Sequence, residues 1–226
     1  MITAKLMKLI MVLSVFLGTA LSTSTAQADV ISVGPGAFPP GSTLITFTGL
    51  ADGTEVNGLN FGGVLFSYSL GNGSVIIDGG PGVTNNISPP NIVSVGNNTG
   101  ILTLLLSAPA DTFGYGYAIL NTVAVANATT ITLFNGITNV GSLAYNGVPD
   151  PNFTGGFAGI QSTILFDRVQ ITFNSAAAPA FALDNIRIAN VNAIPEPTTM
   201  LLLGTGLAGI ALKVRNRRKR IKGEEA

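Results

Sequence analysis

The sequence Phe166-Asp-Arg-Val-Gln-Ile-Thr-Phe173, followed after a short connection by Phe181-Ala-Leu-Asp-Asn-Ile-Arg-Ile188, decides the fold class. In the first stretch, Val169, Ile171 and Phe173 occupy every second position. A period of two places these side chains on one face of the chain, as in a β-strand that buries one side. The two stretches therefore predict a pair of β-strands that close the domain.

The second stretch changes phase halfway along. Phe181 and Leu183 alternate in one phase, whereas Ile186 and Ile188 alternate in the other. A β-bulge inserts one residue into a strand and moves the following side chains to the opposite face. The switch at Asp184-Asn185 therefore predicts a β-bulge that turns polar side chains outward.

Short apolar runs of the same kind continue toward the N-terminus, separated by Gly, Asn, Pro and Ser. Further strands are expected at residues 45–47, 64–70, 75–77, 92–95, 101–106, 113–119, 131–134 and 143–145. No amphipathic helix of normal length appears between residues 30 and 194. Roughly ten short strands with turns between them predict an all-β fold, an antiparallel β-sandwich or jelly roll. Its expected core includes Phe47, Val64, Phe66, Leu104, Val169, Ile171, Phe173 and Ile186.

Charge is unevenly distributed along a chain whose formal net charge is zero. Between Asp29 and Ile194, eight acidic residues accompany two basic ones, Arg168 and Arg187, which gives a net charge of −6. Phosphate contacts need clustered Lys and Arg, so this region does not have the composition of a nucleic-acid-binding domain.

The absence of Cys and His excludes several kinds of catalytic site. Ser/His/Asp and Cys/His nucleophilic sets cannot form, and zinc, copper or non-haem iron sites lose their preferred ligands. Paired carboxylates could still support glycoside hydrolysis, but Glu55 is the one Glu of the domain and its Asp residues stand near turns. We therefore expect no enzyme.

Carboxylate and amide oxygens of the domain could bind one kind of cofactor, a calcium ion. Asp52 and Glu55 stand close together in the sequence, and Asp184 and Asn185 could meet them if the first and last strands pair. Calcium accepts carboxylate and carbonyl oxygens flexibly. The expectation is no cofactor, with a structural calcium ion at these four residues as the alternative.

The N-terminus has the three parts of a secretory signal peptide. Two lysines precede a short apolar run at residues 9–21, and Ala26-Gln27-Ala28 has small residues at the two positions that signal peptidase reads. Residues 1–28 are therefore predicted to be removed by signal peptidase after Ala28, so that the mature protein begins at Asp29.

The C-terminus carries a second three-part signal. Pro195-Glu196-Pro197 precedes an apolar run, which is expected to form a transmembrane helix over residues 198–214. Basic residues follow it: Arg215, Arg217, Arg218, Lys219 and Arg220. The positive-inside bias places such a block on the cytoplasmic side of a membrane.

This order of Pro-Glu-Pro, apolar run and basic end resembles the PEP-CTERM sorting family of exported bacterial proteins. The same segment is also catalogued as an ice-binding protein C-terminal domain. We do not expect ice binding, because a flat ice-binding face requires regularly spaced Thr on a solenoid and the sequence has no fixed repeat. The resemblance implies that a membrane-embedded exosortase recognises Pro195-Glu196-Pro197 and removes the tail. It also implies an exopolysaccharide as the natural partner.

Three domains follow: a signal peptide (1–28), an exported β-domain (29–194) and a sorting signal (195–222). The chain is expected to be exported, held transiently in the inner membrane with its C-terminus in the cytoplasm, and then released to the cell surface or extracellular matrix. The first hypothesis is a non-enzymatic protein of that matrix.

Two alternatives remain open for the β-domain. Residues 166–173 and 181–188 resemble the last strands of bacterial jelly-roll, carbohydrate-binding-like modules. A carbohydrate-binding module is thus the first alternative, with Tyr115, Tyr117 and Tyr145 as sugar-stacking rings unless they pack within the sheet. A carboxylate-dependent glycoside hydrolase is the second.

Overall fold

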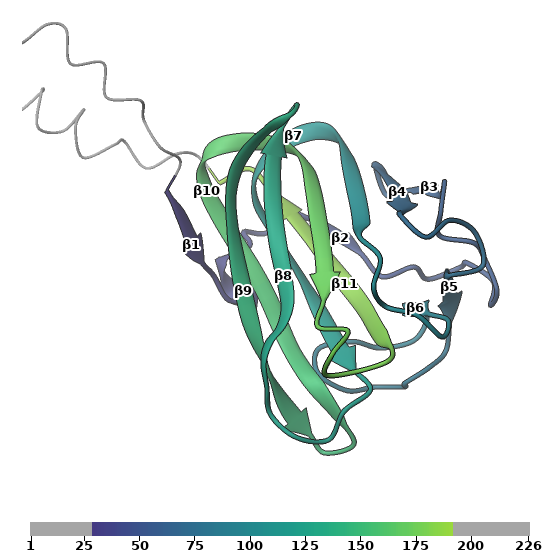
Figure 1. Cartoon of the computed structure of the whole chain (residues 1–226). Coiled ribbons are helices and arrows are strands. Elements are labelled where there is room, and N and C mark those ends of the chain that lie inside the picture. The colour runs from purple at the N-terminus through teal and green to yellow at the C-terminus, as the bar shows by residue number, and fades with distance from the viewer. Residues whose placement is uncertain (1–28, 192–226) are drawn as a thin grey trace, which may run out of the picture.

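The computed structural model describes residues 29–191, which contain eleven β-strands and one short 3₁₀ turn (Figure 1). No helix in this range is long and apolar enough to cross a membrane. The predictions made for the signal peptide, the Pro-Glu-Pro motif, the transmembrane helix and the basic block lie outside the described residues.

All strand pairs are antiparallel, which confirms the predicted all-β, antiparallel class. Hydrogen bonds join the strands into one sheet, in which the longest path runs β5-β6-β11-β7-β10-β8-β9. The elements are β1 (Val30–Ser32), η1 (Pro35–Ala37), β2 (Thr43–Ile45), β3 (Asn60–Phe61), β4 (Val64–Tyr68), β5 (Val75–Asp78), β6 (Asn91–Ser94), β7 (Leu102–Ile119), β8 (Val125–Asn135), β9 (Thr138–Asp150), β10 (Phe153–Phe173) and β11 (Phe181–Ala189).

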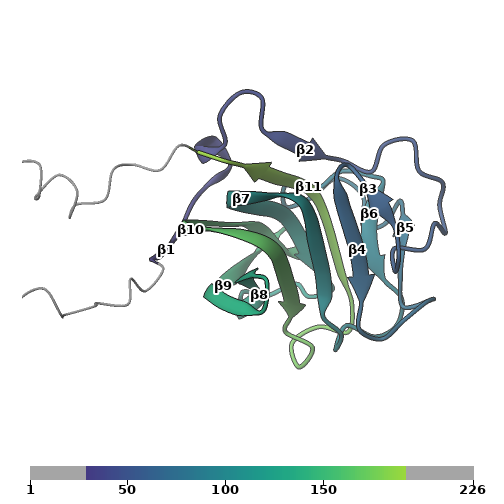
Figure 2. The same ribbon diagram turned by 90° about the horizontal axis from the view of Figure 1, so that it is seen from above.

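Two long strands make this single sheet into two packed layers. The first part of β7 pairs with β4 and its last part with β11, while β10 pairs with β7 along both parts and with β8 through its second part. One layer is therefore β5-β6-β11-β7-β10-β1, and the other is β4-β7-β10-β8-β9. Strands β3 to β6 gather on the side of the molecule opposite β1 and β9 (Figures 1 and 2).

The inner faces of the two layers form the core. Phe173 of β10 stacks on Phe181 of β11 with ring centroids 4.0 Å apart, and it also contacts the rings of Tyr115 and Tyr117. All eight residues predicted for the core are buried, which confirms that prediction. Aromatic contacts of this kind hold the layers together because they bury large apolar surfaces between them.

The predicted β-bulge is present in β11. Pairing with β7 shifts register between Asp184 and Arg187, and Asn185 has a positive φ of 52°. The prediction that the bulge turns its polar side chains outward was wrong for Asp184, which is fully buried. A segment of the chain covers the outer face at this point and encloses the carboxyl group.

Candidate functional site

The outer face of the β11-containing layer is closed by residues 79–90. Ile87 of this segment packs on Ala118 of β7 and Ala182 of β11, and forms a small apolar cluster apart from the main core. The segment approaches the sheet so closely that a Cβ atom at Gly116 would overlap the carbonyl oxygen of Asn86. Small residues on β7 thus let the chain cover this face around Gly116.

Polar side chains of neighbouring strands hold the covering segment in place. Asn185 donates from Nδ2 to the carbonyl oxygen of Asn86 at 2.7 Å, and Asp150 accepts from the amide of Asn85 at 2.9 Å. Asp184 accepts from the amide of Ser88 at 3.2 Å. These bonds tie the segment both to β11 and to the end of β9.

Asp184 is an unusual carboxyl group, because its Oδ1 atom is buried without a hydrogen-bond partner. Burial raises its pKa from the ordinary 3.8 to about 6, although hydrogen bonds from the amides of Asn185 and Ser88 oppose the rise. Asp184 accepts a hydrogen bond from the covering segment and is closed off from solvent, so its environment indicates a structural role.

The outer face of the other layer is open and carries a polar row, with one residue from each of five strands. The register aligns Ser67 with Thr103, Thr103 with Gln170, Gln170 with Thr132, and Thr132 with Ser142. All five side chains are at least partly exposed. Since neighbouring strands lie about 4.8 Å apart, the row is roughly 19 Å long.

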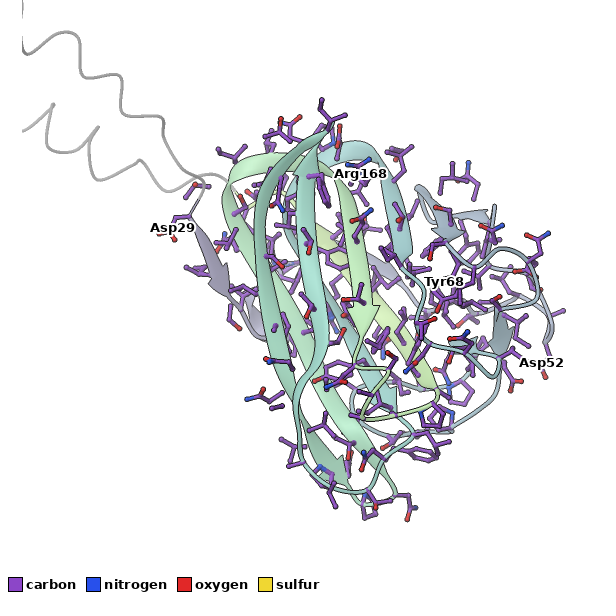
Figure 3. The ribbon with its side chains drawn as sticks, viewed as in Figure 1. Asp29, Asp52, Tyr68 and Arg168 are labelled. Carbon is purple, nitrogen blue, oxygen red and sulfur yellow. The ribbon has the colours of Figure 1, made fainter. Side chains whose placement is uncertain are left out.

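A second row runs beside the first and is more apolar. It consists of Leu65, Leu105, Arg168 and Phe134, aligned across β4, β7, β10 and β8. Leu65 and Leu105 are 42% and 48% exposed. The Arg168 guanidinium carbon lies 4.4 Å from the centre of the Phe134 ring, in a cation–π contact near one end of the long strands (Figure 3).

Together the two rows make an open surface, which we call the five-strand face. Its hydroxyl and amide groups donate and accept hydrogen bonds, and its leucines offer apolar contact. Thr132 and Ser142 already share a hydrogen bond of 3.0 Å, which fixes both hydroxyl groups in position. Such a surface suits a neutral polar polymer that lies across the strands.

The two halves of the predicted calcium site do not come together. Glu55 accepts from the amide of Gly73 at 2.7 Å and bridges to Ile76 of β5, whereas Asp184 lies on β11. Strands β5 and β6 stand between them, which corresponds to about 14 Å of sheet. Asp52 likewise lies on the side of the molecule that carries β3 to β6 (Figure 3).

No group of three or more Asp, Glu, His or Cys side chains is clustered anywhere in residues 29–191. One ion could not therefore contact Asp52, Glu55, Asp184 and Asn185 together. Calcium binding at Asp52 and Glu55 alone stays a prediction.

Tyr115 and Tyr117 are not sugar-stacking rings, because both side chains are fully buried. The Tyr115 hydroxyl bonds to Thr129 at 2.5 Å, and that of Tyr117 donates to the carbonyl oxygen of Asn146 at 3.0 Å. Burial raises the pKa of Tyr117 to about 12 and that of Tyr115 well above 10.0. The alternative, that they pack within the sheet, is confirmed.

Tyr145 is partly buried, and its hydroxyl group also has a hydrogen-bond partner within the domain. Its hydroxyl donates to the carbonyl oxygen of Gly159 at 2.6 Å, and burial raises its pKa to about 12.

The residues of the five-strand face were not found from the sequence. Thr103, Thr132 and Gln170 stand in the polar phase of predicted strands, but the order of strands in the sheet decides which of them align.

The C-terminal part of the sequence contains a signal for protein sorting. The family model described as the PEP-CTERM protein-sorting motif matches residues 193–218. The chain carries a PEP-CTERM sorting motif. The matched range includes Pro195-Glu196-Pro197 and most of the basic block, so the resemblance drawn from these residues is confirmed. A PEP-CTERM motif marks an exported protein sorted to the cell surface and implies processing by an exosortase.

No curated protein matches the chain. Among solved structures, a mutant family 29 carbohydrate-binding module is 9% identical over 75% of this chain and 98% of its own, with a TM-score of 0.37. The catalytic domain of a GH87 α-1,3-glucanase in complex with nigerose is 12% identical over 71% of this chain and 31% of its own, with a TM-score of 0.38.

The enzymatically active domain of tailspike protein 4 from bacteriophage CBA120 is 20% identical over 60% of this chain and 22% of its own, with a TM-score of 0.33. TM-scores this low do not establish a shared fold. None of these likenesses assigns a ligand to the β-domain of the PEP-CTERM chain.

Proposed function

We propose that this chain is a non-enzymatic protein of the cell surface or extracellular polysaccharide matrix, and that its β-domain binds a neutral polysaccharide across the five-strand face. The observation that carries the binding proposal is the polar row from Ser67 to Ser142, aligned by register across five strands and left open to solvent. The PEP-CTERM motif supports the destination.

Row length and chemistry favour an extended polymer. A row of roughly 19 Å is long enough to contact several consecutive sugar rings, and its Ser, Thr and Gln side chains match sugar hydroxyl groups as donors and acceptors. The leucines and the Phe134–Arg168 pair at its side offer apolar contact to the faces of sugar rings.

Charge favours a neutral polymer over an acidic one. The domain carries eight acidic residues against two arginines, so its field repels a polyanion. Arg168 is the cation on the five-strand face, and it is already engaged with Phe134.

A non-enzymatic role is supported by composition. The chain contains no His and no Cys, and the most perturbed carboxyl group, Asp184, lies beneath residues 79–90 and away from the five-strand face. Signal peptidase and an exosortase are the processing partners that the two terminal signals call for, with transient anchoring in the inner membrane between the two cleavages.

The test is binding of the purified full chain to neutral and acidic polysaccharides, with Gln170→Ala as the site variant. Gln170 lies in the middle of the row, so we expect its loss to weaken binding of a neutral polysaccharide about 5–30-fold, which corresponds to about 1–2 kcal/mol for one or two hydrogen bonds. Gln161→Ala is the matched control, because Gln161 is a partly exposed residue of the same strand in the other layer. Equal losses in both variants would rule out the five-strand face, and turnover of the polysaccharide would make the protein an enzyme.

A further inference from the structure

A gap lies on the edge of β7 that faces β4 and β11. Strand β4 pairs with β7 up to Leu106, and β11 pairs with it from Thr112 onward. Between these pairings Ser107, Ala108 and Pro109 are exposed. The residues around the gap form a hollow of about 340 Å³, a volume within the range of small-molecule sites.

Three segments from different parts of the chain form walls around this stretch of β7. They are residues 39–43, the Gly62-Gly63 turn and residues 188–190. Backbone pairing holds these walls in place. The amide of Ser107 donates to the carbonyl oxygen of Gly63 at 2.9 Å, and Thr43 of β2 pairs with Ile188 of β11. A hollow with walls fixed in this way keeps its shape without a ligand, which lowers the cost of ordering on binding.

The lining of the hollow is neutral and mixed in polarity. Among the described residues, none with a charged side chain lines it, although the domain as a whole is acidic. Pro39 and Pro109 contribute C–H surfaces, and Ser107 and Asn190 contribute a hydroxyl and an amide group. The Ser107 hydroxyl lies close to the glycine turn, since a Cβ atom at Gly63 would come within 3.0 Å of its oxygen. Apolar ring surfaces beside neutral donors and acceptors match the C–H faces and hydroxyl groups of an uncharged sugar.

The edge of β7 in this gap does not suit an added peptide strand. The Ser107 amide points to this edge and is already bonded to Gly63. Because backbone groups alternate between the two edges of a strand, the next amide on this edge would be that of Pro109, which has no N–H. An added strand would therefore lack a donor in the middle of the gap. A sugar hydroxyl group is itself a donor and needs only an acceptor such as a carbonyl oxygen.

The hollow lies beside the five-strand face. Thr103, Leu105 and Ser107 alternate with buried leucines along β7 and therefore share the outer side of the sheet. Four residues separate Thr103 of the polar row from Ser107, which corresponds to about 13 Å. The hollow is thus within reach of a branch or a chain end of a polymer that lies on the polar row.

We propose that the hollow is a second carbohydrate site of the domain, which encloses about one or two units of a neutral sugar. The polar row contacts the length of the polymer, and the hollow holds its branch or its chain end. The choice of ligand rests on the proposed function, whereas the site shares no residue with the five-strand face.

Protection of single thiols in the purified full chain tests this site, since the natural sequence contains no Cys. Ser107→Cys and Asn190→Cys place exposed thiols on β7 and on the wall formed by residues 188–190. Ser175→Cys, in the exposed β10–β11 connection, is the matched control. The probes are glucose, galactose, mannose, cellobiose and maltose, with glucuronate as the charged comparison. Any detergent used must have no sugar headgroup.

We expect at least one of the five neutral sugars to slow iodoacetamide labelling of both Ser107→Cys and Asn190→Cys about threefold at twice its Kd, because bound sugar excludes the reagent. Labelling of Ser175→Cys should not change. The proposal is overturned if no neutral sugar protects the two thiols, if Ser175→Cys is protected equally, or if glucuronate protects as well as the neutral sugars.

Adding Gln170→Ala separates this site from the proposed function. Gln170 lies in the polar row and not in the hollow, so the substitution should leave protection of Ser107→Cys unchanged. Protection by a neutral sugar, together with polysaccharide binding that Gln170→Ala does not weaken, would support the hollow and refute the five-strand face. Polysaccharide binding that depends on Gln170, without protection of Ser107→Cys by any of the sugars, would refute the hollow alone.

Discussion

At the scale of single residues, the carboxyl group of Asp184 makes the stability of the fold depend on pH in the mildly acidic range. Its pKa is raised to about 6 by burial, so the folded protein binds a proton more tightly than the unfolded chain does. Between about pH 4 and pH 6 the folded state holds more protons, and the free energy of unfolding falls as pH rises. The stabilising contribution is complete below pH 4 and is lost above the raised pKa.

Asp184→Asn should therefore remove a pH-dependent part of the stability. Between pH 4 and pH 6.5, the free energy of unfolding of the natural protein should fall by about 2–3 kcal/mol relative to that of the variant, because two pKa units correspond to that energy. Urea denaturation at a series of pH values measures it. Comparing the two proteins cancels the titration of the acidic groups that they share. A constant difference across this range would show that the carboxyl group ionises normally.

Phe173 is the residue on which contact between the layers most depends. It stacks on Phe181 and contacts two buried tyrosine rings, so Phe173→Ala should cost roughly 3–5 kcal/mol in the free energy of unfolding. Phe134→Ala is the matched control, because Phe134 lies on the outer face of the same layer and is partly exposed. Its loss should cost about 1 kcal/mol. Chemical denaturation that gives equal losses would contradict the placement of Phe173 between the layers.

At the scale of elements, the sequence predicted strand positions well and strand lengths poorly. Residues 101–106 and 113–119 were expected as separate strands, but they form one strand, β7, of 18 residues. Ser107, Ala108 and Pro109 look like a break, because alternation stops there and Pro lacks an amide donor. In the structure they lie where β7 passes from one layer to the other, and an exposed edge tolerates a missing donor.

Other elements were missed for a related reason. Strands β1 and β3 have three and two residues, too few to show a period. The cover over Gly116 was missed as well, because the chain that forms it, residues 79–90, has turn composition and no periodic pattern. Only the folded arrangement shows that this segment lies on β7 and β11.

The close approach of that segment predicts the effect of one added methyl group. Gly116→Ala would push its Cβ into the carbonyl oxygen of Asn86, a backbone atom, and should cost about 1–3 kcal/mol in the free energy of unfolding. Gly79→Ala is the control, since a Cβ there meets nothing within 4 Å, and it should be neutral or slightly stabilising. Thermal unfolding of both variants measures the effect. A stable Gly116→Ala protein would mean that residues 79–90 do not sit on the sheet.

At the scale of the whole molecule, the sequence indicated a sorted, acidic, all-β domain but not the location of its binding surface. The sorting motif is a local pattern and was readable directly. The five-strand face depends on the order β4-β7-β10-β8-β9, which brings together residues from position 67 to position 170. For the same reason the sequence left open whether the tyrosines stack on sugars or pack within the sheet, because alternation shows that two residues share a face but not which face is buried.

The central claim is that the five-strand face is the surface that a neutral polysaccharide covers. Cysteine accessibility tests it most directly, with single thiols at Ser142→Cys in the polar row and at Ser175→Cys, an exposed residue of the β10–β11 connection. The measurement is the rate of maleimide labelling of each variant with and without saturating polysaccharide. We predict that the polysaccharide slows labelling of Ser142→Cys at least about fivefold and leaves Ser175→Cys unchanged, because a bound polymer excludes the reagent from the row. Unchanged labelling of Ser142→Cys when the polysaccharide is bound would contradict the account.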